Sequence, residues 1–267
     1  MPKITINNLK VTYTNKKKSI VTALENFNCV IEPDTFNVVV GYSGCGKTTL
    51  LRAIAGLIDY EGEIYFDSTD ISNLTIKERN ISLVSQNYAL YPHMTIFDNI
   101  AYPLILAQAP RSEIIERVNS VASYLGISHC LTRKPKHLSG GQQQKVALAR
   151  AMIKKPQLYL FDEPLSNFDL PKRYEAKMMI RKAVKDYAAT AIYVTHDFSE
   201  AMSIADNIIV ISDGKVEISG KPLDVYNSKN PVVEDLKGII DSNEQLVFES
   251  DNWRFKKKKE ELTNSCY

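Results

Sequence analysis

Eight consecutive residues, Gly41–Thr48, fit the phosphate-loop pattern G-x-x-x-x-G-K-[ST]. Glycines in this pattern let the backbone curl so that successive N–H groups face a triphosphate. The lysine then reaches the β- and γ-phosphates, and the threonine hydroxyl binds Mg²⁺. The alternative, a glycine-rich turn with a surface lysine, is disfavoured by the strand and helix patterns on either side. The residues expected to contact the nucleotide here are Gly41, Tyr42, Ser43, Gly44, Cys45, Gly46, Lys47, Thr48 and Thr49.

Three more side chains with acid, base or metal chemistry follow two buried-strand patterns. Asp162 and Glu163 come directly after residues 158–161, and His196 comes soon after residues 190–194. Because the carboxyl ends of parallel strands face the ligand crevice, Asp162 is expected to hold Mg²⁺ and Glu163 to act as general base on an attacking water. His196 is expected to contact the γ-phosphate and that water. The alternatives are an ordinary strand-to-loop transition and a structural histidine.

A second phosphate-binding feature lies later in the chain. Residues Leu138–Gln142, with the sequence Leu-Ser-Gly-Gly-Gln, begin a helical pattern. The N-terminus of a helix exposes amide groups that suit an anion. One nucleotide does not need both features from the same chain, so the second feature requires a separate explanation.

Short runs rich in β-branched and aromatic residues predict the strands that position these side chains. They occur at residues 4–6, 36–40, 81–84, 157–161, 190–194, 208–211 and 215–218, with helical patterns between them. This alternation predicts an α/β fold with a mainly parallel sheet and helices on both faces. Strand patterns stop between residues 88 and 155, where Ser112 is expected to cap a helix whose apolar side is Ile115, Val118, Ala122 and Leu125.

Composition excludes several classes of function. The 33 basic and 31 acidic residues give a net charge of +2, so we expect no nucleic-acid partner. No apolar run approaches the roughly 18 residues that cross a bilayer, and the N-terminus lacks a signal-peptide pattern. We therefore expect a soluble chain whose role at a membrane, if it has one, needs a separate partner. The four cysteines lack metal-site spacing, and Cys45 has either a lowered thiol pKa beside the loop cations or no special role.

The chain resembles the nucleotide-binding subunit of ATP-binding cassette (ABC) transporters, and the residues that carry this resemblance are Gly41–Thr49, Gln86, Leu138–Gln142, Leu160–Pro164, Ser166–Asp169 and His196. It implies a P-loop NTPase with an antiparallel β portion near the N-terminus and a helical subdomain at about 88–155. It also implies hydrolysis of ATP with Mg²⁺. In this family two subunits pair head to tail, so the residues expected at the partner's ATP are Ser139, Gly140, Gly141 and Gln142.

The same resemblance gives roles to three further residues. Tyr13 is similar to the aromatic residue that stacks on adenine, with surface packing as the alternative. Gln86 is similar to the glutamine that touches Mg²⁺ in the catalytic site and reports nucleotide state to the membrane partner. Asp169 is similar to the loop acid that communicates across the dimer.

Residues 84–95 and 98–104 are similar to importer ATPases of the carbohydrate type, so the expected cargo is a sugar. Importer ATPases for iron, polyamine or sulfate share much of this pattern and remain alternatives, as does a soluble cassette ATPase. A phosphate-loop kinase is disfavoured by the second helix N-terminus. The resemblance implies transmembrane permease subunits, an extracytoplasmic solute-binding protein and a second cassette. It also implies a peripheral location on the cytoplasmic face of the cell membrane.

The chain departs from the family pattern at Tyr42, Asp34, Lys145 and Leu170–Pro171, and none of these changes removes a phosphate, metal or base role. Asp34 replaces a turn glycine and is expected to adopt a left-handed backbone. We expect an ATPase domain at residues 1–230. We expect residues 231–267 to be a short C-terminal extension, at the place where carbohydrate-type ATPases usually continue into a β-rich regulatory domain.

Overall fold

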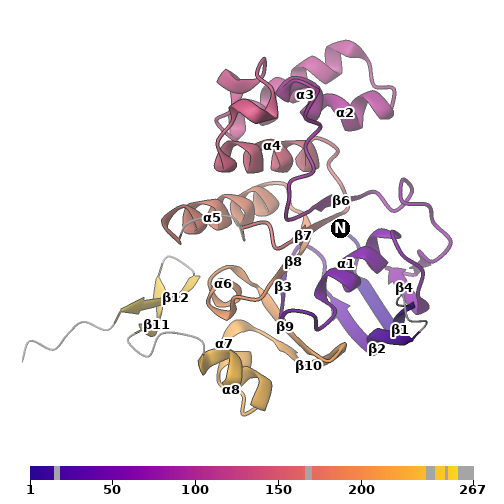
Figure 1. The fold of residues 1–267 in the computed structure, drawn as a ribbon, viewed down its shortest axis with the longest axis vertical. Coiled ribbons are helices and arrows are strands. Elements are labelled where there is room, and N and C mark those ends of the chain that lie inside the picture. Colours follow the sequence, from indigo (N-terminus) through magenta and orange to yellow (C-terminus); the bar gives the residue numbers. More distant parts are fainter. Residues whose placement is uncertain (15–18, 166–169, 239–243, 250–251, 258–267) are drawn as a thin grey trace, which may run out of the picture.

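The computed structural model describes residues 1–14, 19–165, 170–238, 244–249 and 252–257. Its central element is a six-stranded sheet with the strand order β10-β9-β3-β8-β7-β6 (Figure 1). The five strands that run parallel are β3 (Phe36–Val40), β6 (Ile81–Val84), β7 (Leu158–Asp162), β8 (Thr190–Thr195) and β9 (Asn207–Ser212). The edge strand β10 (Lys215–Gly220) pairs antiparallel with β9. The prediction of a mainly parallel sheet is confirmed.

Both faces of the sheet are buried. All five residues of β3 are buried, and they alternate between two cores, with Val38 and Val40 in the first and Val39 in the second. Near-continuous apolar runs are typical of parallel strands that are covered on both sides. The helices that contribute to the first core include α4 (Gly140–Met152), α5 (Leu170–Asp186) and α6 (Phe198–Ile204), and the second core lies against α1 (Lys47–Ala55).

A four-stranded antiparallel sheet with the order β2-β1-β4-β5 completes the second core. Its strands are β1 (Ile4–Thr14), β2 (Ile20–Ile31), β4 (Glu61–Phe66) and β5 (Thr69–Asp70). The sheet confirms the antiparallel portion implied by the resemblance. The residue pattern itself predicted only residues 4–6. Register shifts between Ile6 and Thr12 interrupt the two-residue period that would otherwise mark β1 as one long strand.

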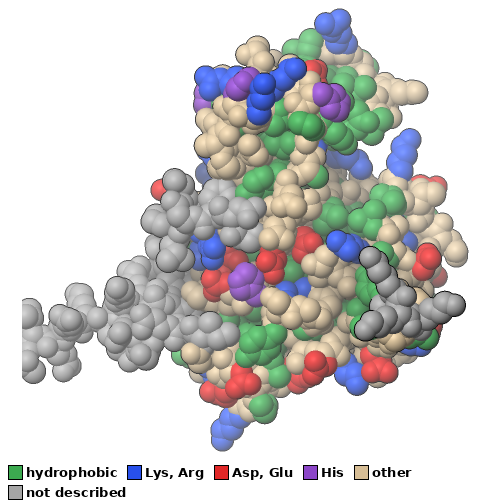
Figure 2. Space-filling view, viewed as in Figure 1, with side chains coloured by type: hydrophobic (Ala, Val, Ile, Leu, Met, Phe, Trp, Pro, Cys, Tyr) green, Lys and Arg blue, Asp and Glu red, His purple; other side chains and the backbone are tan. Residues whose placement is uncertain are grey.

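The segment between β6 and β7 is helical and stands apart from the two sheets in Figure 1. It consists of α2 (Ile96–Leu106), α3 (Arg111–Tyr124), the short 3-10 helices η1 (Ser128–Cys130) and η2 (Pro135–His137), and α4. Basic side chains and histidines gather at the outer end of this segment in Figure 2. That end is therefore solvated. Apolar side chains such as Ile100 and Val118 join the first core, whereas Ile105 and Leu106 are exposed.

Two details of the predicted helix at the start of α3 are wrong. The helix begins at Arg111 after Pro110, so Ser112 lies in its first turn and does not cap it. Pro110 occupies the N-cap position, and no side chain caps the first turn. The apolar side includes Ile114, whereas Ile115 is 43% exposed. The expected left-handed backbone at Asp34 is confirmed, with φ +58°.

The described C-terminal residues form two short helices and a hairpin. These elements are α7 (Pro222–Tyr226), α8 (Pro231–Gly238), β11 (Glu244–Glu249) and β12 (Asn252–Lys257). Valine and leucine side chains of α7 and α8 join the first core. Within the described ranges, no helix combines the length and apolar character that crossing a membrane requires.

Candidate functional site

The phosphate loop joins the end of β3 to the start of α1, as the sequence predicts. Gly46 has φ +104°, a backbone conformation that side-chain-bearing residues rarely adopt. A β-carbon on Gly46 would lie 2.5 Å from the carbonyl oxygen of Ala23, and one on Gly41 would lie 2.2 Å from that of Ile211. The loop backbone is therefore pressed against two neighbouring strands, and only glycine fits at both positions.

Lys47 folds its ammonium group over this loop. The side chain is buried, and Nζ donates to the carbonyl oxygens of Gly41 at 2.8 Å and Tyr42 at 2.7 Å. Neither acceptor is charged, so the positive charge of Lys47 remains available to attract an anion. The residue borders a cavity of about 250 Å³ lined by Ala23, Ser43, Gly44, Gly46, Lys47, Thr48, Thr49, Gln86, Asp162 and Glu163.

A hydroxyl and a carboxylate meet at the far wall of this cavity. Thr48 Oγ1 donates to Asp162 Oδ1 at 2.8 Å, which joins the first turn of α1 to the end of β7. Burial raises the pKa of the Asp162 carboxyl, while the bond from Thr48 opposes this shift. In the described part of the chain, no group of three or more His, Cys, Asp or Glu side chains is arranged to hold a metal. Any metal at Asp162 must therefore take further ligands from its surroundings.

Glu163 and His196 form a pair at the edge of the cavity. Glu163 Oε1 lies 3.1 Å from His196 Nδ1, although the two residues follow different strands. The backbone of Glu163 has φ +44°, and its N–H donates to the carbonyl oxygen of Val194 at 3.1 Å. A non-glycine residue in this conformation is strained, and such strain is retained where the surrounding structure fixes it. The bond to β8 supplies that restraint.

Other residues expected at the nucleotide lie around the same loop. Tyr13 belongs to β1, and its hydroxyl lies 3.4 Å from Thr49 Oγ1 with 38% of the side chain exposed. This side chain is therefore free to offer a ring face beside the loop. Gln86 lines the cavity, and Tyr42 is largely exposed on the loop surface. Asp169 lies outside the described residues.

The N-terminus of α4 does not meet the phosphate loop. Ser139 caps the helix, with Gln142 N–H donating to Ser139 Oγ and Ser139 N–H donating to Gln142 Oε1. This reciprocal arrangement is a capping box, and it leaves the backbone of Gly140 and Gly141 at the surface. The end of the helix lines a separate cavity of about 450 Å³, which shares no lining residue with the cavity beside Lys47.

The expectation of a lowered thiol pKa at Cys45 is wrong. Burial raises the pKa of the Cys45 thiol, and the charge and hydrogen bond of Lys47 offset this only in part. The thiol is held inside the loop and is almost completely buried. Desolvation of the thiol therefore outweighs the charge and the hydrogen bond of the nearby ammonium.

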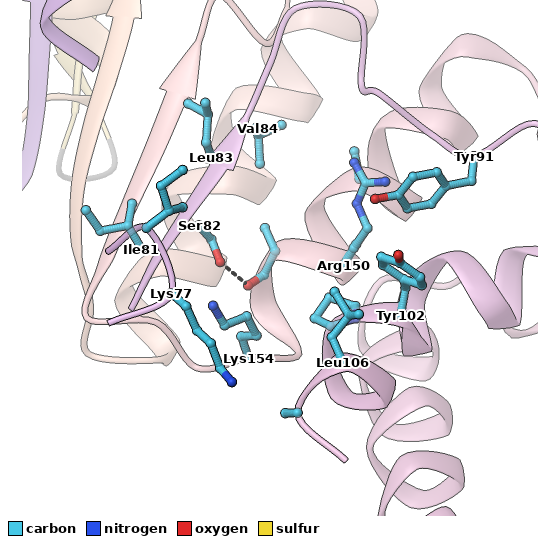
Figure 3. Close-up of a pocket in the computed structure, with 15 residues that line it drawn as sticks. Lys77, Ile81, Ser82, Leu83, Val84, Tyr91, Tyr102, Leu106, Arg150 and Lys154 are labelled. Carbon is cyan, nitrogen blue, oxygen red and sulfur yellow. Dashed lines mark hydrogen bonds between the residues drawn. The ribbon is translucent and has the colours of Figure 1, made fainter. Parts of the chain in front are cut away.

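Sequence reasoning missed a larger cavity of about 580 Å³ between β6 and the helical segment (Figure 3). Its walls are mainly apolar and include Val84 and Leu106, with Lys77 and Lys154 at one end. Burial and the nearby charge of Lys77 lower the pKa of Lys154. The cavity is built from segments that are distant in sequence, so no single motif marks it.

Arg150 fixes the other end of this cavity. Its guanidinium donates to the carbonyl oxygens of Tyr88 and Ala89 at 2.7 and 2.8 Å, and it lies over the ring of Tyr91. Both carbonyl-bearing residues have positive φ angles. The arginine thus holds the irregular loop after Gln86 against α4, and it links the nucleotide cavity to this second cavity through one short segment.

Comparison with known proteins identifies the family. A model of the ABC transporter family matches residues 24–166, more than half of the chain. The sn-glycerol-3-phosphate import ATP-binding protein UgpC of Psychromonas ingrahamii is 45% identical over 229 residues, covering 85% of this chain and 60% of that protein. The oligosaccharides import ATP-binding protein MsmX of Bacillus subtilis is 47% identical over 205 residues, covering 76% of this chain and 56% of that protein.

A solved structure agrees with these sequence matches. It is the dimeric post-hydrolysis state of the ATP-binding cassette MJ0796 bound to ADP and Pi, with a TM-score of 0.73 and 31% identity. The match covers 82% of this chain and 98% of that one. The chain spans about 60% of the length of the import proteins that it matches. With its phosphate loop, its capped Leu-Ser-Gly-Gly-Gln helix and these matches, the chain belongs to the ABC transporter family.

Proposed function

We propose that this chain binds Mg-ATP and hydrolyses it as the nucleotide-binding subunit of an importer. The observation that carries the proposal is the Glu163–His196 pair, 3.1 Å apart, in which Glu163 lines the same cavity as Lys47, Thr48 and Asp162. Such a pair has no evident use in a protein that only binds nucleotide. The importer ATPases among its relatives support the wider role.

The residues present fit a magnesium nucleotide. The proposed phosphate ligands are the loop amides and Lys47, and the proposed Mg²⁺ ligands are Thr48, Asp162 and Gln86. Hard oxygen donors suit Mg²⁺, which normally combines one or two carboxylates with phosphate oxygens and waters. This agrees with a site in which the half-buried Asp162 carboxylate lies beside the Thr48 hydroxyl and the described residues form no metal cage of their own. When bound, Mg²⁺ would neutralise charge on the phosphate oxygens.

Glu163 is the proposed general base. Its carboxylate would take a proton from the water that attacks the γ-phosphate, while His196 holds the opposite side of the carboxylate through Nδ1. Glu163 has a left-handed backbone directly after β7, and the residue lines the cavity beside Lys47. This chain itself would contribute to the reaction by positioning the Glu163 carboxylate, through the neighbouring His196 and through the restrained backbone of Glu163.

We further propose that two cassettes form the complete site. Ser139, Gly140, Gly141 and Gln142 would contact the ATP held by the partner's phosphate loop, because the exposed amide groups of α4 face a different cavity from that of Lys47. The dimeric cassette structures that resemble this chain support the arrangement. Tyr13 is proposed to stack on adenine, and Asp169 to act across the dimer.

The partner at the membrane is proposed to be a pair of permease subunits. A cytoplasmic permease segment would enter the 580 Å³ cavity, which has apolar walls, exposed Leu106 and Ile76 beside it, and basic residues at its ends. Residues 88–155 would act as the helical subdomain of an ATPase domain spanning 1–230, with 231–267 as its extension. The chain would lie on the cytoplasmic face of the membrane. An extracytoplasmic solute-binding protein would act through the permease subunits, and we propose no nucleic-acid partner.

The proposed cargo is a sugar or sugar-like solute. Relatives named for glycerol-phosphate and oligosaccharide import favour this class, and importers of iron, polyamine or sulfate are the alternative. Reconstitution of the chain in lipid vesicles with candidate permease subunits tests the cargo directly. Mg-ATP hydrolysis in such vesicles should rise with a sugar and its binding protein, and stimulation by ferric iron, spermidine or sulfate alone would favour the alternative.

Hydrolysis is tested by Glu163→Gln, which keeps the size of the side chain and removes its basicity. Loss of a general base typically lowers the rate by about 10² to 10⁴. The variant should bind Mg-ATP and elute as a dimer in Mg-ATP, whereas Glu217→Gln, an exposed change in β10, should hydrolyse at the wild-type rate. A Glu163→Gln protein with wild-type turnover would show that another group activates the water.

A further inference from the structure

A buried carboxylate stands behind the Glu163–His196 pair. Glu200 belongs to α6 and is 5% exposed. Tyr193 donates its hydroxyl hydrogen to Glu200 Oε1 at 2.9 Å, and Thr195 donates from Oγ1 to Glu200 Oε2 at 2.6 Å. Each carboxylate oxygen thus has its own donor from β8. Burying a carboxylate costs free energy, so this arrangement needs an explanation.

The network ties down both chain neighbours of His196. Thr195, which precedes the histidine, holds Glu200 through its hydroxyl, and the same hydroxyl accepts the N–H of Asp197 at 3.1 Å. Asp197, which follows the histidine, accepts the N–H of Glu200 on Oδ1 at 2.9 Å. His196 is therefore the single residue between two anchors that converge on Glu200.

His196 itself has little packing to hold it. Its side chain is 54% exposed, yet Nδ1 lies 3.1 Å from the Glu163 carboxylate. The orientation of an exposed ring depends chiefly on the backbone that carries it. The backbone here is set by Thr195, Asp197 and Glu200, whose contacts lie in the interior.

We infer that Glu200 is a positioning residue that acts through Thr195 to hold His196 against Glu163. The inference rests on the proposed function for its effect on turnover, but the geometry itself is independent of that function. A glutamine at position 200 has one acceptor oxygen and one NH2 donor in place of two acceptor oxygens, so only one of the two hydroxyls can still donate to it. Thr195→Val removes the hydroxyl and keeps the shape, and Thr195→Ser keeps the hydroxyl.

The experiment compares kcat and KM for Mg-ATP in these variants. Thr195→Val and Glu200→Gln should lower kcat by about 10- to 100-fold, the size of loss that a misplaced catalytic group produces, with KM within about twofold of wild type. Thr195→Ser should restore most of kcat. Ser203→Ala is the matched control, because it removes a buried hydroxyl bonded at 2.8 Å to the backbone carbonyl of Glu200 without touching the neighbours of His196. Its kcat should stay within about twofold of wild type.

A double-mutant cycle separates positioning from general weakening of the fold. Adding Thr195→Val to His196→Ala should lower kcat by less than about twofold, since the histidine through which Thr195 acts is gone. The same loss in both backgrounds, or failure of Thr195→Ser to restore turnover, would overturn the inference.

A nuclear magnetic resonance signal tests the geometry without hydrolysis. The chain has four histidines, so the ring Cε1–H signal of His196 is identified by its absence from His196→Ala. Glu163→Gln should shift this signal in the wild-type background and leave it unchanged in Thr195→Val. A shift of equal size in both backgrounds would refute the positioning role even if Mg-ATP were not hydrolysed. Absence of hydrolysis in the wild-type protein would instead refute the proposed function.

Discussion

Two glycines of the phosphate loop differ in a way that predicts unequal effects of the same substitution. Gly44 and Gly46 have φ +87° and φ +104°, but a β-carbon on Gly44 meets no atom within 4 Å. On Gly46 it would lie 2.5 Å from the Ala23 carbonyl oxygen and 2.7 Å from Leu24 Cδ2. Gly44→Ala therefore adds only backbone strain, and Gly46→Ala adds the same strain together with overlap against a neighbouring strand.

The magnitudes follow from these contacts. Left-handed backbone costs about 1–2 kcal/mol for a residue with a β-carbon, and the stiffer unfolded chain returns about 0.4–1 kcal/mol. Gly44→Ala should thus lower the free energy of unfolding by about 1 kcal/mol. Overpacking against a fixed backbone typically adds about 1–3 kcal/mol, so Gly46→Ala should cost about 3 kcal/mol in total.

Thermal unfolding of the nucleotide-free protein measures the difference. For a chain of this size, a loss of about 1 kcal/mol in the free energy of unfolding lowers Tm by about 2–4 °C. The Tm of Gly44→Ala should therefore fall by about 3 °C, and that of Gly46→Ala by about 9 °C. The two variants carry the same glycine-to-alanine substitution in the same loop, so each serves as the control for the other. Equal values of Tm would refute the argument from close approach, and a larger fall for Gly44→Ala would show that the loop is arranged differently.

Three further predictions concern the site. Ser139→Arg and Lys47→Ala chains are each expected to be inactive alone. A verified mixed dimer of the two should regain partial hydrolysis, because both changes then fall on one composite site and the other site stays intact. Complete inactivity of that mixed dimer would argue against head-to-tail pairing. Asp162→Asn should raise the Mg²⁺ concentration that supports half-maximal hydrolysis while leaving the base in place, and an unchanged Mg²⁺ dependence would remove Asp162 from the metal site. Because burial raises the pKa of the Cys45 thiol, a smaller fraction of it is thiolate at a given pH, so iodoacetamide should modify it more slowly than free cysteine at pH 8 and faster as the pH rises. Modification at the rate of free cysteine, mapped to Cys45 by mass spectrometry, would contradict this shift.

The fold was largely predictable because its central strands are buried on both faces. Residues 36–40 and 190–194 are nearly uninterrupted β-branched or aromatic runs, and these became β3 and β8. Of the antiparallel sheet, the residue pattern indicated only residues 4–6 of β1. In β2 most side chains at the start are exposed, including Ile20 at 72%, so its apolar residues do not follow a two-residue period.

The residue types of the site could be predicted from the sequence, but the contacts between these residues could not. Motifs indicated which types of side chain to expect after each strand, and their roles stay predictions. The cavity beside Arg150 depends on carbonyl groups of Tyr88 and Ala89 in left-handed backbone, for which tyrosine and alanine give no sequence signal. The pKa of Cys45 depends on how far the loop closes over the thiol, which only coordinates reveal.

Strand register explains why residues so distant in sequence meet at one edge. Val40 lies opposite Thr195, and Asp162 lies opposite Val194, so the phosphate loop, Glu163 and His196 all leave the sheet at nearly the same level. A slip of one residue would turn every side chain of a strand to the other face, and double burial makes such a slip costly. The packing of β3, β7 and β8 therefore sets the 3.1 Å separation of Glu163 and His196 before any local contact does. Glu200 then refines that separation from within the core, which is why its loss should reduce turnover more than the affinity for nucleotide.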